Sequence, residues 1–256
     1  MSRPCASGGR SAVAALSLLV LLGHSGAVRA DPRCAAPAQV WGGFPPLERA
    51  QTRLERERRL TIVAIGSSGT EGGGATSPAA SYPAPLDHLR EERFPGVPIE
   101  VVNRGVGGET VADNLGRFDR DVLAFEPALV IWQVGTNDAL TGVPDLALRR
   151  QLLEGIARAR ASGAEIVLMD PQPVPDPERA RAIDRVEAVL VATAREARVP
   201  LLSRHALMRH WLSSGQLAAA SLLGPDGLHM TDVSYRCLAE RVGDLLPAAR
   251  AVADAS

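Results

Sequence analysis

The 256-residue chain contains no lysine, and aromatic residues make up only 4% of it. The absence of lysine excludes a phosphate-binding loop of the P-loop type, which requires a lysine after its glycines. All positive side chains other than histidine are arginines, and they form no basic block, which argues against nucleic acid as a partner. The few aromatic residues offer no obvious platform on which sugar rings could stack.

Long apolar runs are also missing, apart from one near the N-terminus at residues 12–22. It is shorter than the roughly 20 residues that cross a bilayer, so we expect no stable membrane span. Arg3 and Arg10 precede this run, and the small residues of AVRA follow it, which is the order of a secretory signal peptide. We predict a cleaved signal over 1–30 and a periplasmic or secreted protein. An uncleaved membrane anchor is the alternative.

Cysteine is scarce, and cleavage of the signal would leave only Cys34 and Cys237. In an exported protein this pair predicts a disulfide, although two buried free thiols would also fit. Cleavage removes three arginines and no acidic residue, so the net charge changes from −1 to −4. The remaining length suits one core: a lead-in and surface helix over 31–59, followed by the main domain over 60–250.

Strand-like and helix-like segments alternate along the main domain. Apolar runs typical of buried strands lie at 60–65, 98–102, 128–134, 164–169 and 199–202. Helical patterns lie at 80–94, 110–125, 145–162, 177–197 and 231–250. Continuous apolar strands that alternate with helices indicate a parallel sheet covered on both faces. We therefore predict an α/β fold, a three-layer α/β/α sandwich with a five-stranded parallel sheet.

Glycine and polar residues gather where the expected strands end, at GSSGT, NRGVGGET, GTND and DPQP. Ligands of such sheets bind in the crevice beyond the carboxyl ends of the strands. The segment GVGGET matches the dinucleotide fingerprint only in part, so a nucleotide cofactor is not expected. No His, Cys, Asp or Glu cluster has the spacing of a metal site, and we expect no metal either.

A serine nucleophile fits the first of these loops better than a ligand cradle does. Ser68 follows a buried strand and lies near the start of a helix-forming region. A serine hydroxyl needs a base to take its proton. His229 falls in the loop GPDGLHM with Asp226 three residues before it, so one loop could supply both a base and the carboxylate that orients it.

Acyl transfer also requires hydrogen-bond donors aimed at the developing oxyanion. The backbone N–H groups of Ser68 and Gly108 and the side-chain amide of Asn137 could supply them. Each residue alone could be an ordinary turn or cap residue. Together they would place a nucleophile, a base, an acid and an oxyanion hole on adjacent strand ends.

These four blocks, in this order, resemble the SGNH/GDSL hydrolases, a family of esterases, lipases and deacetylases. The resemblance covers residues 60–250 and implies a flavodoxin-like SGNH fold, with Ser68 as nucleophile and Asp226 and His229 completing the triad. It also implies that Gly108 and Asn137 complete the oxyanion hole. The first block departs from the family's usual G-D-S, because it reads Gly66-Ser67-Ser68.

We therefore expect a secreted serine esterase that cleaves an acyl ester through an acyl-enzyme intermediate. The ester could be short-chain, a lipid, a thioester or an acetylated glycan, and the sequence does not choose among these or fix the oligomeric state. Two alternatives are a non-catalytic binding protein on the same scaffold, suggested by Ser67, and an acyltransferase that uses the same triad.

Overall fold

The computed structural model describes Met1 and residues 31–42, 47–86 and 97–246. The predicted signal at 1–30 and most of the helix expected at 80–94 lie outside these residues. Five parallel strands form one sheet in the order β2-β1-β3-β4-β5. Their bounds are β1 (Leu60–Gly66), β2 (Ile99–Gly105), β3 (Leu129–Gln133), β4 (Glu165–Met169) and β5 (Leu201–Leu202).

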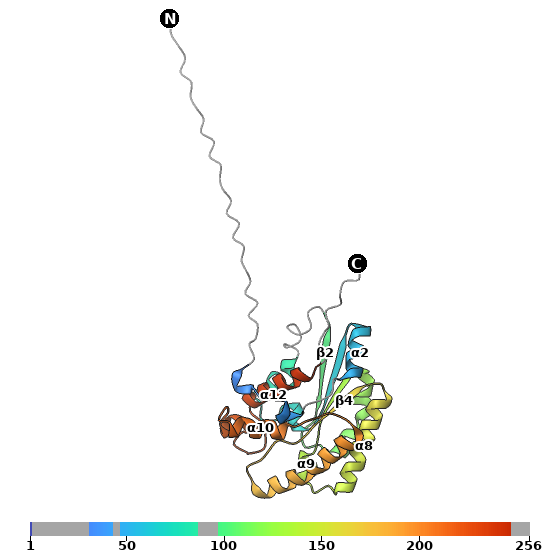
Figure 1. Cartoon of the computed structure of the whole chain (residues 1–256), viewed down its shortest axis with the longest axis vertical. Coiled ribbons are helices and arrows are strands. Elements are labelled where there is room, and N and C mark those ends of the chain that lie inside the picture. The colour runs from blue at the N-terminus through green and yellow to red at the C-terminus, as the bar shows by residue number, and fades with distance from the viewer. Residues whose placement is uncertain (2–30, 43–46, 87–96, 247–256) are drawn as a thin grey trace.

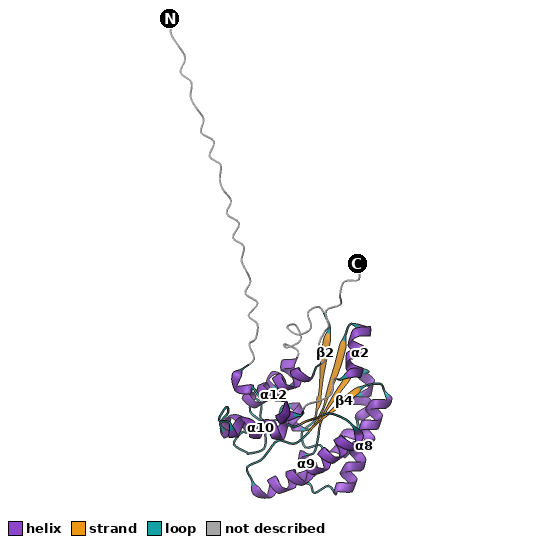
Figure 2. Cartoon of the chain, viewed as in Figure 1, coloured by secondary structure: helices purple, strands orange, loops and turns teal. Residues whose placement is uncertain are grey.

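Helices cover both faces of this sheet, which confirms the predicted three-layer fold (Figures 1 and 2). One face packs against α1 (Ala38–Trp41), α2 (Glu48–Glu57), α10 (Arg204–Ser213), α11 (Ala219–Leu222) and α12 (Asp232–Leu245). The other packs against α5 (Val111–Gly116), α6 (Phe118–Asp121), α7 (Thr136–Leu140), α8 (Asp145–Ala161) and α9 (Pro177–Ala197).

Alternate residues of each central strand point to opposite faces, as a pleated strand requires. In β1, Ile62 and Ala64 join the core on the α12 side, whereas Val63 and Ile65 join the core on the α8 side. Because both faces are buried, the strand must be apolar at every position. This explains why the central strands β1, β3 and β4 are nearly continuous apolar runs in the sequence.

The region expected to form one helix over 110–125 is divided into α5, α6 and a 3-10 turn at Leu123–Phe125. The first break follows Gly116, a residue that disfavours helix interiors. Arg117 lies at this break and is buried, where it pairs with Glu109 and Asp121. The break thus places a charged side chain between the loop after β2 and α6.

The described part of the lead-in, residues 31–42, contains short helical turns. These are a 3-10 turn at Pro32–Cys34 and the helix α1. Cys34 and Trp41 are buried in the core on the α12 side, and Cys34 forms a disulfide with Cys237 of α12. The predicted disulfide is therefore present. Within the described residues, none of the helices combines the length and apolarity needed to cross a bilayer.

Candidate active site

The nucleophile candidate Ser68 lies where β1 ends and a short helix begins. β1 ends at Gly66, Ser67 follows in an extended conformation, and Ser68 is the first residue of α3 (Ser68–Glu71). The side chain of Ser68 is half-buried, and its Oγ lies 3.1 Å from Nε2 of His229. The structure therefore brings together two residues that are 161 positions apart in the sequence.

His229 is held by the loop between α11 and α12. A bridge between Leu223 and Met230 closes the base of this loop, and the amide of Gly224 donates to the carbonyl of His229 at 2.8 Å. Nδ1 of His229 lies 2.6 Å from Oδ2 of Asp226. Ser68, His229 and Asp226 thus form a continuous hydrogen-bonded chain, the arrangement of a serine hydrolase triad.

The carboxylate of Asp226 is kept ionised by hydrogen bonds within its own loop. Its Oδ1 accepts from the backbone N–H of Leu228 at 2.9 Å and of His229 at 3.0 Å. These bonds and the contact with the His229 ring lower the pKa of Asp226 to about 2, with the Leu228 amide contributing most. At neutral pH the carboxylate of Asp226 can therefore accept a hydrogen bond from Nδ1 of His229.

The glycine-rich segment after α3 packs against Ser68 and His229. A Cβ atom on Gly73 would lie 2.7 Å from the His229 ring and 2.9 Å from Cβ of Ser68, so no larger residue fits there. The hydroxyl of Tyr235 on α12 donates to the carbonyl of Gly73 at 2.8 Å. Burial raises the pKa of Tyr235 to about 12, which keeps this donor protonated. No local sequence pattern marks Gly73 or Tyr235, because their roles depend on packing between distant segments.

The two loops expected to supply oxyanion donors lie next to each other. Gly108, in the loop after β2, has a φ of +81°, which favours glycine. Nδ2 of Asn137, on α7, donates to the carbonyl of Glu109 at 2.8 Å, which joins α7 to this loop. The loop also passes Ser68, since a Cβ atom on Gly107 would lie 3.9 Å from the Cβ of Ser68. The amide of Asn137 has a second N–H that this bond does not use.

Ser67, which stands where the resemblance leads one to expect aspartate, is buried against β3. Its Oγ donates to Oε1 of Gln133 at 3.2 Å, and its backbone N–H donates to the same oxygen at 3.1 Å. The hydroxyl of Thr70 also donates to this oxygen, at 3.3 Å. Gln133, on the neighbouring strand β3, therefore fixes the turn between β1 and α3. No local sequence pattern indicates this role.

A buried arginine lies under the same turn. Arg204 is fully buried, and its Nε donates to the carbonyl of Asp170 at 3.1 Å. Its Nη1 lies close to Gly69, since a Cβ atom on Gly69 would be 2.6 Å from Nη1. Burial raises the pKa of the Asp170 carboxyl to about 7. Arg204 could not be recognised as buried from the sequence, since an Arg at the start of an amphipathic helix usually indicates an exposed side chain.

Two further histidines in the described part of the chain, His205 and His210, lie on α10, and His88 lies outside the described residues. Trp211 of α10 is a core residue, with its Nε1 donating to the carbonyl of Cys34 at 3.2 Å. Of the histidines in the described part of the chain, His229 is the one within hydrogen-bonding distance of Ser68.

Comparisons with known proteins point in the same direction as this geometry. The model of the non-GDSL lipase-like family matches residues 33–251. The chain is similar to the esterase TesA of Pseudomonas aeruginosa, with 29% identity over 184 residues that cover 71% of this chain and 85% of that protein. It is also similar to a GDSL lipase of Mycobacterium tuberculosis, with 28% identity over 80% of this chain and 89% of that protein.

Among solved structures, a lipolytic protein of the G-D-S-L family from Desulfitobacterium hafniense superimposes with a TM-score of 0.63. It shares 26% sequence identity, and the match covers 73% of this chain and 99% of that one. The fold and the sequence therefore point to the same group of proteins.

Proposed function

Because the chain belongs to the non-GDSL lipase-like family of SGNH/GDSL hydrolases and is a serine esterase, we propose that Ser68, His229 and Asp226 are its catalytic triad. The observation that carries this proposal is the continuous chain of contacts from Ser68 Oγ to His229 Nε2 and from His229 Nδ1 to Asp226. The second contact holds the imidazole in the orientation that a general base needs.

In the proposed reaction, His229 Nε2 takes the proton of Ser68 while Oγ attacks the carbonyl carbon of the ester. The tetrahedral intermediate then collapses, the proton on His229 passes to the leaving alkoxide, and an alcohol departs from the acyl-enzyme. Water, deprotonated by His229, attacks the acyl-enzyme and releases the carboxylic acid and free Ser68. Asp226 stays ionised throughout and stabilises the imidazolium.

The negative charge of the tetrahedral intermediate requires donors that are already in place. We propose the backbone N–H groups of Ser68 and Gly108 and the side-chain amide of Asn137. The bond from Asn137 to the carbonyl of Glu109 supports this role, because it fixes the orientation of the amide before substrate arrives. An amide held in this way needs no reorganisation as charge develops.

The relatives are named as esterases and lipases, and this is the support for a carboxylic ester as substrate. An acyltransferase would use the same triad and differ only in the acceptor that attacks the acyl-enzyme. A non-catalytic binding protein is not favoured, because Ser67 leaves the arrangement of Ser68 and His229 intact.

We also propose that the protein is exported after removal of residues 1–30. The disulfide between Cys34 and Cys237 supports an oxidising compartment, since such bonds rarely persist in the cytosol. The periplasm and the exterior of the cell both meet this condition.

The triad assignment can be tested by labelling the purified protein with a fluorophosphonate and by assaying a short activated ester. Ser68 should carry the label, and Ser68→Ala and His229→Ala should each lower kcat by roughly 10³-fold or more, because each removes one member of a cooperating unit. His210→Ala is the matched control on another helix and should leave kcat close to wild type.

A label on Ser67, or undiminished turnover by Ser68→Ala, would refute the assignment. Rapid labelling with slow hydrolysis that accelerates when an alcohol acceptor is added would instead indicate an acyltransferase.

A further inference from the structure

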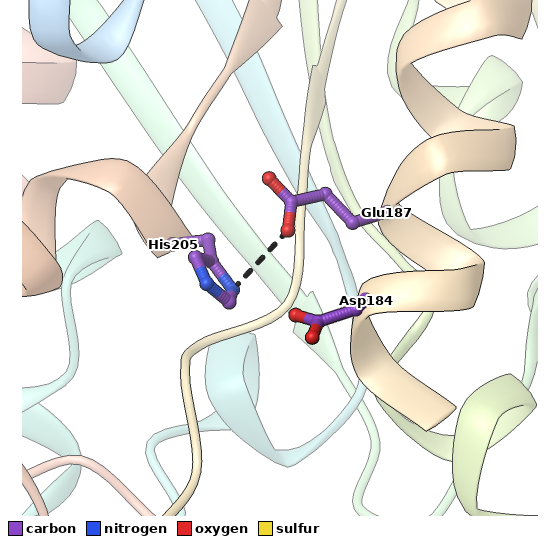
Figure 3. Close-up of side chains that lie close together, drawn as sticks. All are labelled: Asp184, Glu187 and His205. Atoms are coloured by element: carbon purple, nitrogen blue, oxygen red, sulfur yellow. Dashed lines mark ion pairs between the residues drawn. The ribbon is translucent and has the colours of Figure 1, made fainter. Parts of the chain in front are cut away.

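Three potential metal ligands come together between α9 and α10, away from the triad. Asp184 and Glu187 lie one helical turn apart on α9, and His205 lies in the first turn of α10 (Figure 3). One ligand atom from each residue can be chosen such that all three lie within 4.8 Å of one another. The side chains of Asp184 and Glu187 both extend from α9 toward the imidazole in Figure 3.

The imidazole of His205 is buried but incompletely bonded. Its side chain is only 8% exposed, and Nδ1 makes no hydrogen bond. Oε2 of Glu187 lies 3.4 Å from Nδ1, which is longer than an ordinary hydrogen bond to nitrogen. A buried polar atom without a hydrogen bond is uncommon in folded proteins, and here Nδ1 faces the carboxylate of Glu187 at ion-pair distance (Figure 3).

The spacing suits a shared cation better than a direct bond. Zn²⁺ binds imidazole nitrogen and carboxylate oxygen at about 2.0–2.2 Å in a tetrahedral arrangement, which separates two ligand atoms by about 3.4 Å. The separation of Nδ1 and Oε2 equals this value. Asp184 is exposed, so its carboxylate can rotate toward the ion as a third ligand.

The surroundings leave room for solvent ligands. Asp184 and His205 line a surface hollow of about 380 Å³, together with Pro173, Val174 and Arg209. The charges of Arg209 and Arg204 oppose a cation here, and the carboxylates of Glu187 and Asp184 balance them. One nitrogen and two oxygen ligands favour a divalent transition metal over Mg²⁺ or Ca²⁺, which take oxygen ligands.

We propose that Asp184, Glu187 and His205 form a binding site for a divalent transition-metal ion of the Zn²⁺ class. The site ties α9 to α10. It has no part in the ester chemistry, and water completes the coordination of the ion.

The proposal can be tested with untagged protein that has been treated with a chelator and dialysed. Calorimetric titration with ZnCl₂ should show one strong site per chain, and a Zn²⁺ concentration of 100 times Kd should raise Tm by about 5 °C or more. MgCl₂ at the same concentration should leave Tm unchanged.

Variants connect the binding to these residues. His205→Gln and Asp184→Asn should each weaken Zn²⁺ binding at least tenfold and abolish most of the Tm shift. His210→Gln, on the same helix, should bind as wild type does. Because Asp184 is exposed, its variant remains informative even if His205→Gln folds poorly. A wild type that fails to bind Zn²⁺, or retention of wild-type affinity in either ligand variant, would overturn the proposal.

Discussion

At the scale of single residues, the turn between β1 and α3 depends more on Gln133 than on the serine that replaces aspartate. One oxygen of Gln133 accepts three hydrogen bonds, two from Ser67 and one from Thr70. Loss of the Ser67 hydroxyl leaves this oxygen with two donors. Loss of the Gln133 side chain leaves the buried amide of Ser67 without its acceptor, and this change destabilises the folded protein more.

We therefore expect Ser67→Ala to lower the free energy of unfolding by about 1 kcal/mol and kcat by less than about tenfold. Gln133→Ala should lower the free energy of unfolding by about 2–4 kcal/mol, because it also leaves a cavity. It should lower kcat more than Ser67→Ala does. Urea unfolding and ester turnover measure both effects. Equal losses of stability in the two variants would contradict the role given to Gln133.

At the scale of elements, the charges around α6 hold it to the loop after β2. The carboxylate of Asp121 pairs with Arg120 at 2.8 Å and with Arg117 at 3.2 Å, and Arg117 in turn pairs with Glu109 at 2.6 Å. Nη2 of Arg117 also donates to the carbonyl of Gly66 at 3.3 Å. The helix is thus connected to the end of β1, next to the turn that carries Ser68.

This network predicts a dependence of stability on pH. The hydrogen bond from Arg120, followed by that from Arg117, lowers the pKa of Asp121 from 3.8 to about 2. Asp121 therefore ionises more readily in the folded protein than in the unfolded chain. Its contribution to stability is complete above about pH 4 and is lost as the pH falls toward 2.

Urea unfolding of Asp121→Asn should show a loss of about 1 kcal/mol in unfolding free energy at pH 6, a small value because the partner Arg120 is 76% exposed and solvent screens this pair. The difference from wild type should vanish near pH 2. Asp119→Asn is the matched control on α6, since 80% of the Asp119 side chain is exposed. It should lower the free energy of unfolding at pH 6 less than Asp121→Asn does. A loss that is the same at pH 6 and pH 2 would assign the effect to packing.

At the scale of the whole molecule, the disulfide joins the start of the described chain to its last helix. Cys34 and Cys237 are 203 residues apart and fully buried. Asp31 strengthens the same junction, because it pairs with Arg236 at 2.9 Å. A covalent link across so long a loop restricts the unfolded chain strongly, by about 5 kcal/mol in the loop-entropy estimate, which is an upper value.

We expect the double variant Cys34→Ala/Cys237→Ala to lose about 2–4 kcal/mol of unfolding free energy, because measured disulfide contributions usually fall in this range. A reducing agent should lower the Tm of the wild type but not that of the variant. Thiol titration of denatured, unreduced protein that starts at Asp31 should find no free thiol. Two free thiols would show that the cysteines serve only as small apolar residues.

The sequence by itself determined the fold class and the residues proposed for catalysis. Both faces of a parallel sheet are buried, so its strands must be apolar runs that are easily recognised between helical patterns. The polar and glycine residues at the strand ends then mark one edge of the sheet, since all the strands run in the same direction. Ser68 could be singled out for this reason, and Asp226 and His229 because one loop holds a histidine and a carboxylate three residues apart. The structure places the three residues within hydrogen-bonding distance.

Only the tertiary structure decided which distant side chains surround these residues. Gln133, Gly73 and Tyr235 act through contacts across the sheet edge and between a loop and α12, and no local pattern encodes such contacts. Residue spacing does not reveal the cluster of Asp184, Glu187 and His205 for the same reason, because its histidine comes from a different helix. Short-range patterns in the sequence specify elements and their ends, whereas the packing of helices on the sheet determines which side chains meet.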